Sequence, residues 1–400
     1  MTSSKPQFVG QKVKLSDICS IVSGATPKTT VKDYWGGDIK WITPSELNDD
    51  SHVIYNTAKH LTEAGFASAR LRMFPEGTVL LTTRAPIGKV AIAGEPMCCN
   101  QGFKNLVCSD AVNNEYLYRY LKNRSSELQV LGRGATFKEL SKKEVAAYEI
   151  NLPPLKRQLE AVEKLALVDK QVVIAKTQLD KLDSLVKSRF IEMFGDPVEE
   201  NRWARITLAS LCTKLGSGAT PRGGKAAYKT SGIPLIRSMN VHNGYFESKD
   251  LAYIDEIQAK KLDNVTLHKG DVLLNITGAS VARSCLLPDY LAGGRVNQHV
   301  SIVRCDPNRM LPRVLNSIFT SDSYQRFLLE HSRMAGATRE AITKDDLETM
   351  TVPLPPLSLQ YKFAAFVAQA DKSRFGGMLH LLNSLSGIMH ASFFSVADTD

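Results

Sequence analysis

The chain has 400 residues, of which 43% are hydrophobic and 23% charged, as in globular proteins of about two to three domains. Fifty Lys and Arg against 41 Asp and Glu leave a net charge of +9, which favours a polyanionic partner such as nucleic acid. The sequence has no apolar run of about 18 residues, as a membrane span would require, and no N-terminal apolar run of the kind found in signal peptides. We therefore expect a cytoplasmic protein, and its seven unpatterned cysteines indicate reduced thiols.

The sequence contains an internal repeat with a period of about 200 residues. SGATPK at Ser23–Lys28 returns as SGATPR at Ser217–Arg222, and NQGFKNLVC returns as NQHVSIVRC. Three further collinear pairs are IKWITPSEL with IPLIRSMNV, FPEGTVLLTTRAPIGKVAI with LHKGDVLLNITGASVARSC, and GRGATFKELSKKEV with MAGATREAITKDDL. The repeat indicates a duplicated globular part rather than a solenoid of short units.

Each copy of the repeat is rich in short β-prone runs that begin at a glycine, such as Gly77–Thr83 and Gly270–Ile276. A helical pattern follows these runs in both copies. We therefore predict two α/β or α+β domains with mixed sheets, which we call head one (residues 1–152) and head two (residues 198–354).

A long helix is predicted after each head, because the proline pair in each Pro-Pro-Leu sequence cannot lie inside a helix. In the first helical segment, residues 153–197, apolar residues recur at steps of three and four, as in a coiled-coil seam. These are Leu165, Val168, Val172, Ala175, Leu179, Leu182, Val186, Phe190 and Met193. The sequence FGDP after this seam predicts the end of the helix.

The second helical segment, residues 355–394, has apolar residues at compatible spacing, and Gly376-Gly377 predicts a kink in it. We predict that the two helices pack on each other as an antiparallel coiled coil that separates the heads. A coiled coil between two copies of the chain is the alternative. Residues 395–400 are predicted to be a disordered tail.

Three loops that contain Gly and Thr beside basic residues recur in both heads, and such loops bring amides and cations to phosphates and base edges. For a single loop, an ordinary turn on a solvated face is the alternative, and the repetition favours binding. The predicted DNA contacts of head one are Gly24, Thr26, Lys28, Thr43, Arg84, Lys89, Arg133 and Lys138. Those of head two are Gly218, Thr220, Arg222, Arg237, Asn275, Arg283 and Arg339.

The sequence has no metal-spaced His pair, no HExxH or GxSxG motif, and no Gly-rich nucleotide motif after a strand. NLPPL at Asn151 is similar to the Asn-Pro-Pro-aromatic motif of DNA amino-methyltransferases, but Leu152 interrupts the motif and Leu155 replaces its aromatic residue. We predict no catalytic residue and no metal ligand. A stand-alone DNA methyltransferase or nuclease, and an adhesion protein with paired heads, are the alternatives.

The order head, helix, head, helix, with the SGATP loops, the GATFKELSKKEV segment, the LPPL sequences and FIEMFGDP, resembles the DNA specificity subunit of type I restriction–modification enzymes. The resemblance extends from about Val13 to Phe394. It implies two target-recognition domains, each for one half of a bipartite, asymmetric double-stranded DNA site, and helices that set the spacer and dock two methyltransferase subunits. It also implies that this chain binds no cofactor, and that S-adenosylmethionine, ATP and Mg²⁺ belong to partner subunits, including a motor–nuclease (restriction) subunit.

Overall fold

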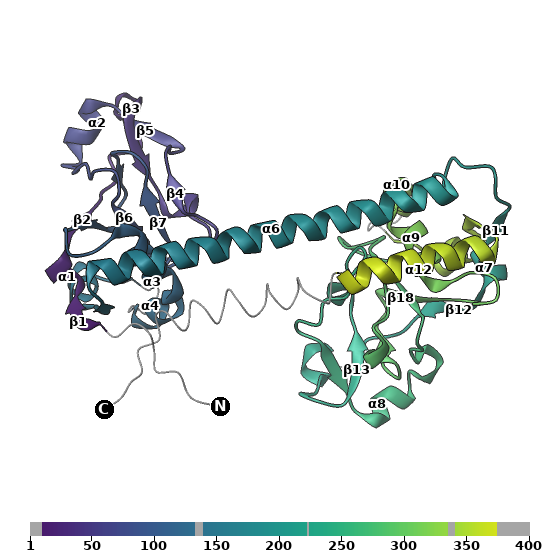
Figure 1. The fold of residues 1–400 in the computed structure, drawn as a ribbon. Helices are drawn as coiled ribbons and strands as arrows, with labels where there is room; N and C mark the ends of the chain where they lie inside the picture. Colours follow the sequence, from purple (N-terminus) through teal and green to yellow (C-terminus); the bar gives the residue numbers. More distant parts are fainter. Residues whose placement is uncertain (1–9, 133–138, 222–223, 335–340, 374–400) are drawn as a thin grey trace. The chain divides into compact units, whose positions relative to one another are not determined.

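The computed structural model describes residues 10–132, 139–221, 224–334 and 341–373 (Figure 1). The described residues up to Lys176 form one compact unit, and those from Thr177 onward form a second. The first unit contains head one and the beginning of helix α6 (Leu155–Phe194), and the second contains the rest of α6, head two and helix α12 (Leu357–Ser373). Within the described ranges, no helix is both long and apolar enough to cross a membrane.

Head one combines parallel and antiparallel strand pairs, as predicted. Its larger sheet has the order β2-β9-β6-β7-β4, with bounds Cys19–Ser23, Lys104–Cys108, Val79–Leu81, Val90–Ala93 and Val53–Ile54. A second sheet has the order β5-β3-β8, with bounds Lys59–Leu61, Trp35–Ile42 and Cys98–Cys99. Strand β1 (Gln11–Lys14) pairs with β10 (Glu149–Leu152). The helices are α1 (Leu15–Ile18), α2 (Glu63–Ser68), α3 (Asn114–Asn123), α4 (Ser125–Leu131) and α5 (Lys142–Ala147), with 3-10 turns η1 (Lys32–Tyr34) and η2 (Pro44–Glu46).

Head two repeats this topology, which confirms the duplication inferred from the sequence. Its larger sheet has the order β12-β18-β15-β16, with bounds Cys212–Ser217, Val300–Cys305, Val272–Asn275 and Ser284–Leu286. The smaller sheet has the order β14-β13-β17, with bounds Ala252–Ile254, Ile233–Ile236 and Arg295–Val296, and β11 (Arg205–Thr207) pairs with β19 (Thr351–Pro353). The helices are α7 (Leu208–Leu211), α8 (Glu256–Lys260), α9 (Pro312–Thr320), α10 (Asp322–Met334) and α11 (Lys344–Thr349). The 3-10 turns are η3 (Gly224–Ala227), η4 (Ser238–Asn240), η5 (Asp263–Val265) and η6 (Asp289–Leu291).

Helix α6 is a continuous helix of 40 residues that lies inside the predicted segment 153–197. It begins directly after the proline pair and ends at Phe194, where Gly195 adopts the left-handed conformation (φ +79°) that ends many helices. All nine predicted seam positions are buried or half-buried, whereas most of the positions between them are exposed. The periodicity of the sequence therefore identified the buried face of this helix correctly.

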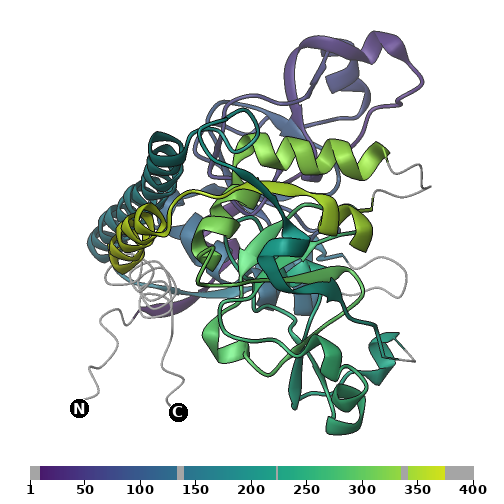
Figure 2. The ribbon, with the colours of Figure 1, turned by 90° about the vertical axis from the view of Figure 1, so that its right-hand side faces the viewer.

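Helix α12 packs antiparallel against the C-terminal end of α6, within the second unit (Figures 1 and 2). Near the start of α12, the ring of Phe363 lies edge-on to the rings of Phe190 and Phe194, with centroid distances of 5.6 and 5.5 Å. Val367, one turn further along α12, is in the same apolar cluster as Val186. The predicted antiparallel packing is thus confirmed for the described part of the second helix; residues 374–394, which include Gly376-Gly377, and the tail 395–400 lie outside the described residues.

A buried glutamine joins each long helix to the head that precedes it. The side chain of Gln158 accepts a hydrogen bond from the backbone N–H of Asn113 (2.8 Å) and donates to the carbonyls of Ala111 (3.0 Å) and Pro153 (2.8 Å). Gln360 repeats all three bonds, with Leu311 N–H (2.8 Å) and the carbonyls of Arg309 (2.9 Å) and Pro355 (2.8 Å). The glutamine therefore hydrogen bonds to backbone groups of the head and to the backbone just before the helix, on both sides of the junction.

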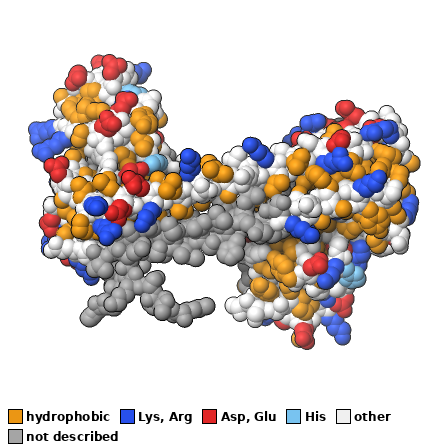
Figure 3. Space-filling view, in the orientation of Figure 1, with side chains coloured by type: hydrophobic (Ala, Val, Ile, Leu, Met, Phe, Trp, Pro, Cys, Tyr) orange, Lys and Arg blue, Asp and Glu red, His pale blue; other side chains and the backbone are white. Residues whose placement is uncertain are grey.

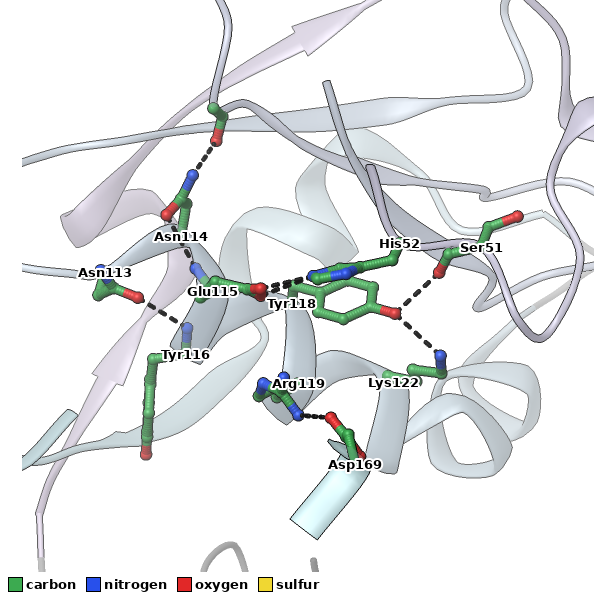
Figure 4. A network of polar contacts seen from close by, with 11 residues as sticks. Ser51, His52, Asn113, Asn114, Glu115, Tyr116, Tyr118, Arg119, Lys122 and Asp169 are labelled. Carbon is green, nitrogen blue, oxygen red and sulfur yellow. Dashed lines mark hydrogen bonds and ion pairs between the residues drawn. The ribbon is translucent and has the colours of Figure 1, made fainter. Parts of the chain in front are cut away.

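An ion pair makes the second connection between head and helix, and it uses the fifteenth residue of each helix. In the first unit, Arg119 on α3 donates to Asp169 on α6 (2.6 Å), as Figure 4 shows. In the second unit, Arg313 on α9 donates to Asp371 on α12 (2.9 Å). Helix α3 is in turn held to the loop before β4 by hydrogen bonds from Tyr118 to Ser51 and between His52 and Glu115 (Figure 4).

Candidate nucleic-acid interface

In head one, the first and second predicted loops meet at residues 100–102. The backbone N–H of Ala25 in the SGATP loop donates to the carbonyl of Cys99 (3.1 Å), and the hydroxyl of Thr26 donates to the side chain of Gln101 (2.5 Å). On the other side, the N–H of Thr83, at the end of β6, donates to the carbonyl of Gly102 (2.7 Å). Two loops far apart in sequence are therefore joined through one short turn.

The residues that follow the third predicted loop of head one lie beside the second loop. Residues 133–138 lie outside the described ranges, but Glu139 forms a β-bridge with Arg84, and the N–H of Leu140 donates to the carbonyl of Thr83 (2.9 Å). The first two loops and the segment that follows the third thus belong to one region of the head.

Head two brings the equivalent segments together with three equivalent hydrogen bonds and a fourth that is shifted by one residue on each side. The N–H of Gly218 donates to the carbonyl of Asn297 (3.1 Å), and Thr220 donates to the side chain of Gln298. Ile276 N–H donates to the carbonyl of His299 (3.0 Å), and Ile342 N–H to the carbonyl of Ile276 (2.8 Å). The same loop arrangement on two heads indicates one binding architecture used twice.

The two arrangements carry different side chains. In head one the carboxylate of Glu139 forms ion pairs, with oxygens 2.9 Å from Nε of Arg84 and 3.7 Å from Nζ of Lys104. In head two the hydroxyl of Thr277 is hydrogen bonded to Nδ1 of His299 (2.5 Å), whose Nε2 lies 3.1 Å from the amide nitrogen of Gln298. One head therefore presents ionic groups where the other presents a hydroxyl, an imidazole and an amide.

The glycines of the SGATP loops allow a close approach of two backbones. A Cβ on Gly24 would collide with the carbonyl oxygens of Cys99 and Asn100, and one on Gly218 with the carbonyl of Val296. This packing, rather than a ligand, accounts for glycine at both positions, and a contact of Gly24 or Gly218 with phosphate stays a prediction.

Several predicted contact residues hold the loops in place. Thr43 N–H and hydroxyl bond to Glu46 (2.7 and 2.9 Å), and Lys89 is half-buried and donates to the carbonyl of Leu47 (3.2 Å). Arg237 is half-buried, lies over the ring of Tyr228 and donates to the carbonyl of Asp250.

Asn275 departs most from its prediction, because its side chain is fully buried and its amide donates to the carbonyl of Ser238 (2.9 Å) and to the hydroxyl of Ser280 (3.2 Å). A side chain without exposed atoms cannot reach a base edge, so we assign Asn275 a role in shaping the second loop of head two. By contrast Lys28 is exposed and Arg283 is half-exposed. The predicted residues Arg133, Lys138, Arg222 and Arg339 lie outside the described residues.

Sequence reasoning missed the residues that connect the loops, namely Gln101, Lys104, Glu139, Gln298 and His299. The repeated Asn-Gln pair was a usable signal, because both asparagines form the same turn: Asn100 accepts from Gly102 N–H (2.9 Å) and Asn297 from His299 N–H (3.1 Å). Glu139 gave no such signal, since its counterpart in head two is Ala341.

The surface as a whole does not single out these regions. On the face drawn in Figure 3, Lys and Arg side chains lie among acidic and hydrophobic ones on both units. Among the described residues, no group of three His, Cys, Asp or Glu side chains is placed to hold a metal ion. The interface is therefore defined by converging loops and their hydrogen bonds.

Comparison with known proteins identifies the family. The sequence profile of the "Type I restriction modification DNA specificity domain" matches residues 10–184. The MjaIX specificity subunit of a type I restriction enzyme from Methanocaldococcus jannaschii is 30% identical over 378 residues, which cover 88% of this chain and 85% of that protein.

Two solved structures share the fold over nearly the whole chain. The S subunit of a type I restriction–modification system from M. genitalium has a TM-score of 0.54 at 12% identity, with 99% of this chain and 98% of that chain covered. A chain from a study of complex assembly and conformational transition of the type I R-M system has a TM-score of 0.57 at 17% identity, with 98% and 99% covered. The repeated heads, the long helix and the match to the archaeal subunit agree, and this chain belongs to the DNA specificity subunits of type I restriction–modification enzymes.

Proposed function

We propose that this chain selects the DNA sequence on which a type I restriction–modification complex acts, and that each head binds one half of a bipartite, asymmetric double-stranded site. The observation that carries the proposal is the repeated convergence of two loops and the segment after the third, with ionic side chains in head one and uncharged polar side chains in head two. Because base edges are distinguished by the donors and acceptors presented to them, two heads with different groups recognise different half-sites.

The long helix suits a spacer between half-sites. A helix of 40 residues is about 60 Å long, whereas one turn of DNA is about 34 Å. The bonds of Gln158 and Asp169 fix the first head to this helix, so that the head and the start of the helix move together. We infer that the helices set the number of unspecified base pairs between the two half-sites.

We infer that methylation and cleavage take place on partner subunits, which bind S-adenosylmethionine, ATP and Mg²⁺. Family membership supports this division, because a specificity subunit acts within a larger enzyme. One of the structural neighbours was solved in a study of complex assembly and conformational transition of the type I R-M system. The partners proposed for this chain are two methyltransferase subunits and, in a restricting complex, motor–nuclease subunits.

A second apolar stripe on α6 is a suitable docking surface for a methyltransferase subunit. Exposed large hydrophobic residues of this helix include Leu155, Leu159, Leu167, Ile174, Leu185 and Ile191. At about 100° per residue these six lie within an arc of about 120°, on the opposite side of the helix from the seam. An exposed apolar stripe on a helix is a common feature of helix-mediated partner binding.

Leu167→Glu is expected to weaken association with the methyltransferase subunit at least about 10-fold, because it places a carboxylate within an apolar contact. Affinity is measured by titrating the purified methyltransferase subunit against the full chain. Gln171→Glu serves as the control, because it adds the same negative charge at an exposed position outside the stripe. This variant is expected to bind with the wild-type affinity. Equal affinity of both variants and the wild type would exclude the stripe as the docking surface.

The proposed function is tested by mapping methylated bases in the host genome with and without this chain. We expect one bipartite, non-palindromic motif whose methylation disappears when the chain is deleted, because the two heads differ at their loops. A palindromic motif, or unchanged methylation after deletion, would refute the proposal.

A further inference from the structure

The ionic cluster of head one joins three segments at a single carboxylate. Arg84 follows strand β6, Lys104 begins strand β9, and Glu139 follows the third loop. One carboxylate oxygen of Glu139 lies 2.9 Å from Nε of Arg84, and the other lies 3.7 Å from Nζ of Lys104. Each oxygen of Glu139 is therefore paired with a cation of the protein.

Exposure increases from Lys104 to Arg84. The side chain of Lys104 is 10% exposed, that of Glu139 is 34% exposed and that of Arg84 is 46% exposed. Burial lowers the pKa of Lys104, and the charge of Glu139 opposes that shift. The buried lysine thus pairs with the carboxylate, and the carboxylate pairs with the exposed arginine.

This arrangement leaves the two terminal nitrogens of the Arg84 guanidinium available to donate hydrogen bonds to a ligand. Glu139 approaches Arg84 at Nε, and among the described residues the two terminal nitrogens of Arg84 donate no hydrogen bond. A guanidinium presents parallel donors that match O6 and N7 of guanine, and holding it in place beforehand reduces the entropy lost on binding. The β-bridge between Arg84 and Glu139 brings the two side chains together, and a half-exposed ion pair between them contributes little to stability.

Head two lacks the cluster at the equivalent positions. The β-bridge that joins Arg84 to Glu139 in head one joins Thr277 to Ala341 in head two. In head one, Ser23 of strand β2 pairs with Lys104. In head two, the equivalent residue Ser217 of strand β12 pairs with Ser301, so Ser301 takes the place of Lys104. The ionic cluster is therefore a difference between the heads and not part of the shared scaffold.

We propose that Arg84 recognises a guanine in the half-site bound by head one, and that Glu139, held by Lys104, is the positioning residue that orients Arg84. The inference rests on the proposed function and deepens it by naming the base and the residues. The negative charge of Glu139 also reduces the attraction of this surface for phosphates, so Glu139 favours sequence discrimination over overall affinity for DNA.

The experiment measures binding of the full chain, purified with its partner subunits, to DNA in which the first half-site is randomised and the second is constant. For the wild type, one position of the first half-site is expected to prefer guanine by about 10-fold or more. Arg84→Ala and Arg84→Lys are both expected to lose this preference, since lysine keeps the charge without the paired donors. Glu139→Gln is expected to lower the preference while binding of non-specific DNA becomes stronger.

Glu95→Gln is the matched control, because it removes the same charge from another ion pair of head one, that with Lys40. It is expected to leave base preference unchanged, and unchanged hydrogen exchange of head-one peptides shows that head one is folded in each variant. A wild-type complex that prefers no sequence in either half would refute the proposed function as well. A wild type that requires a bipartite site but shows no guanine preference, or keeps it in the Arg84 and Glu139 variants, would overturn this inference alone.

Discussion

Arg304→Met is expected to lower the free energy of unfolding of the second unit by about 3–5 kcal/mol, because it leaves a buried carboxylate without its partner. Arg304 on β18 donates from Nε and Nη2 to the two carboxylate oxygens of Asp271 (2.6 and 2.9 Å). Asp271 is fully buried and also accepts from the N–H of His268 (2.8 Å). The loss is measured by hydrogen exchange of peptides from strands β15 and β18, with peptides of head one as the internal reference.

Head one supplies the control for this prediction. Strand pairing places Thr78 and Val107 where head two has Asp271 and Arg304. The double substitution Asp271→Thr/Arg304→Val introduces the residues that head one has at these positions. It is expected to recover most of the lost stability, because no unpaired charge remains. Lys269→Met, which breaks an exposed pair with Asp289, is expected to cost less than about 1 kcal/mol. If Arg304→Met cost no more than Lys269→Met, the buried pair would not stabilise head two.

Gln158→Leu and Gln360→Leu are each expected to destabilise the junction of one head with its helix by about 3 kcal/mol. Leucine fills a similar volume at this fully buried position but leaves one backbone N–H and two carbonyls without their hydrogen bonds to the glutamine. Hydrogen exchange is expected to rise in α3 for the Gln158 variant and in α9 for the Gln360 variant.

The decisive measurement is whether each glutamine variant increases hydrogen exchange in its own head only. Gln171→Leu, on the exposed face of α6, is the control and is expected to change stability by less than about 0.5 kcal/mol. If either glutamine variant left exchange in its own head unchanged, the side chain would not hold the junction. Faster exchange in both heads from a single variant would show instead that the two units unfold together.

Much of the architecture could be predicted from local sequence. The proline pairs preceded both long helices, and the apolar seam from Leu165 to Met193 identified the buried face of α6. The collinear repeat anticipated two heads of equal topology. These predictions succeed because helix termination, amphipathic periodicity and duplication are all properties of neighbouring or aligned residues.

The candidate site was only partly predictable. The three loops were identified, yet Asn275 proved to be buried and the connecting residues Gln101 and Gln298 were overlooked. Whether a polar side chain points into the loop or toward solvent depends on backbone geometry that its own sequence neighbours do not reveal. Glu139 shows the same limit, because its partners Arg84 and Lys104 lie 55 and 35 positions earlier in the chain.

By itself, then, the amino-acid sequence determined the order of heads and helices, the buried face of α6 and the family to which the chain belongs. Only the tertiary structure decided that two distant loops and the segment after the third share one region of each head, and that Glu139 pairs with a buried lysine and an exposed arginine there. The physical reason is that periodicity and chain stops act over a few residues, whereas the closure of a loop against another strand is a long-range contact that only the folded chain establishes.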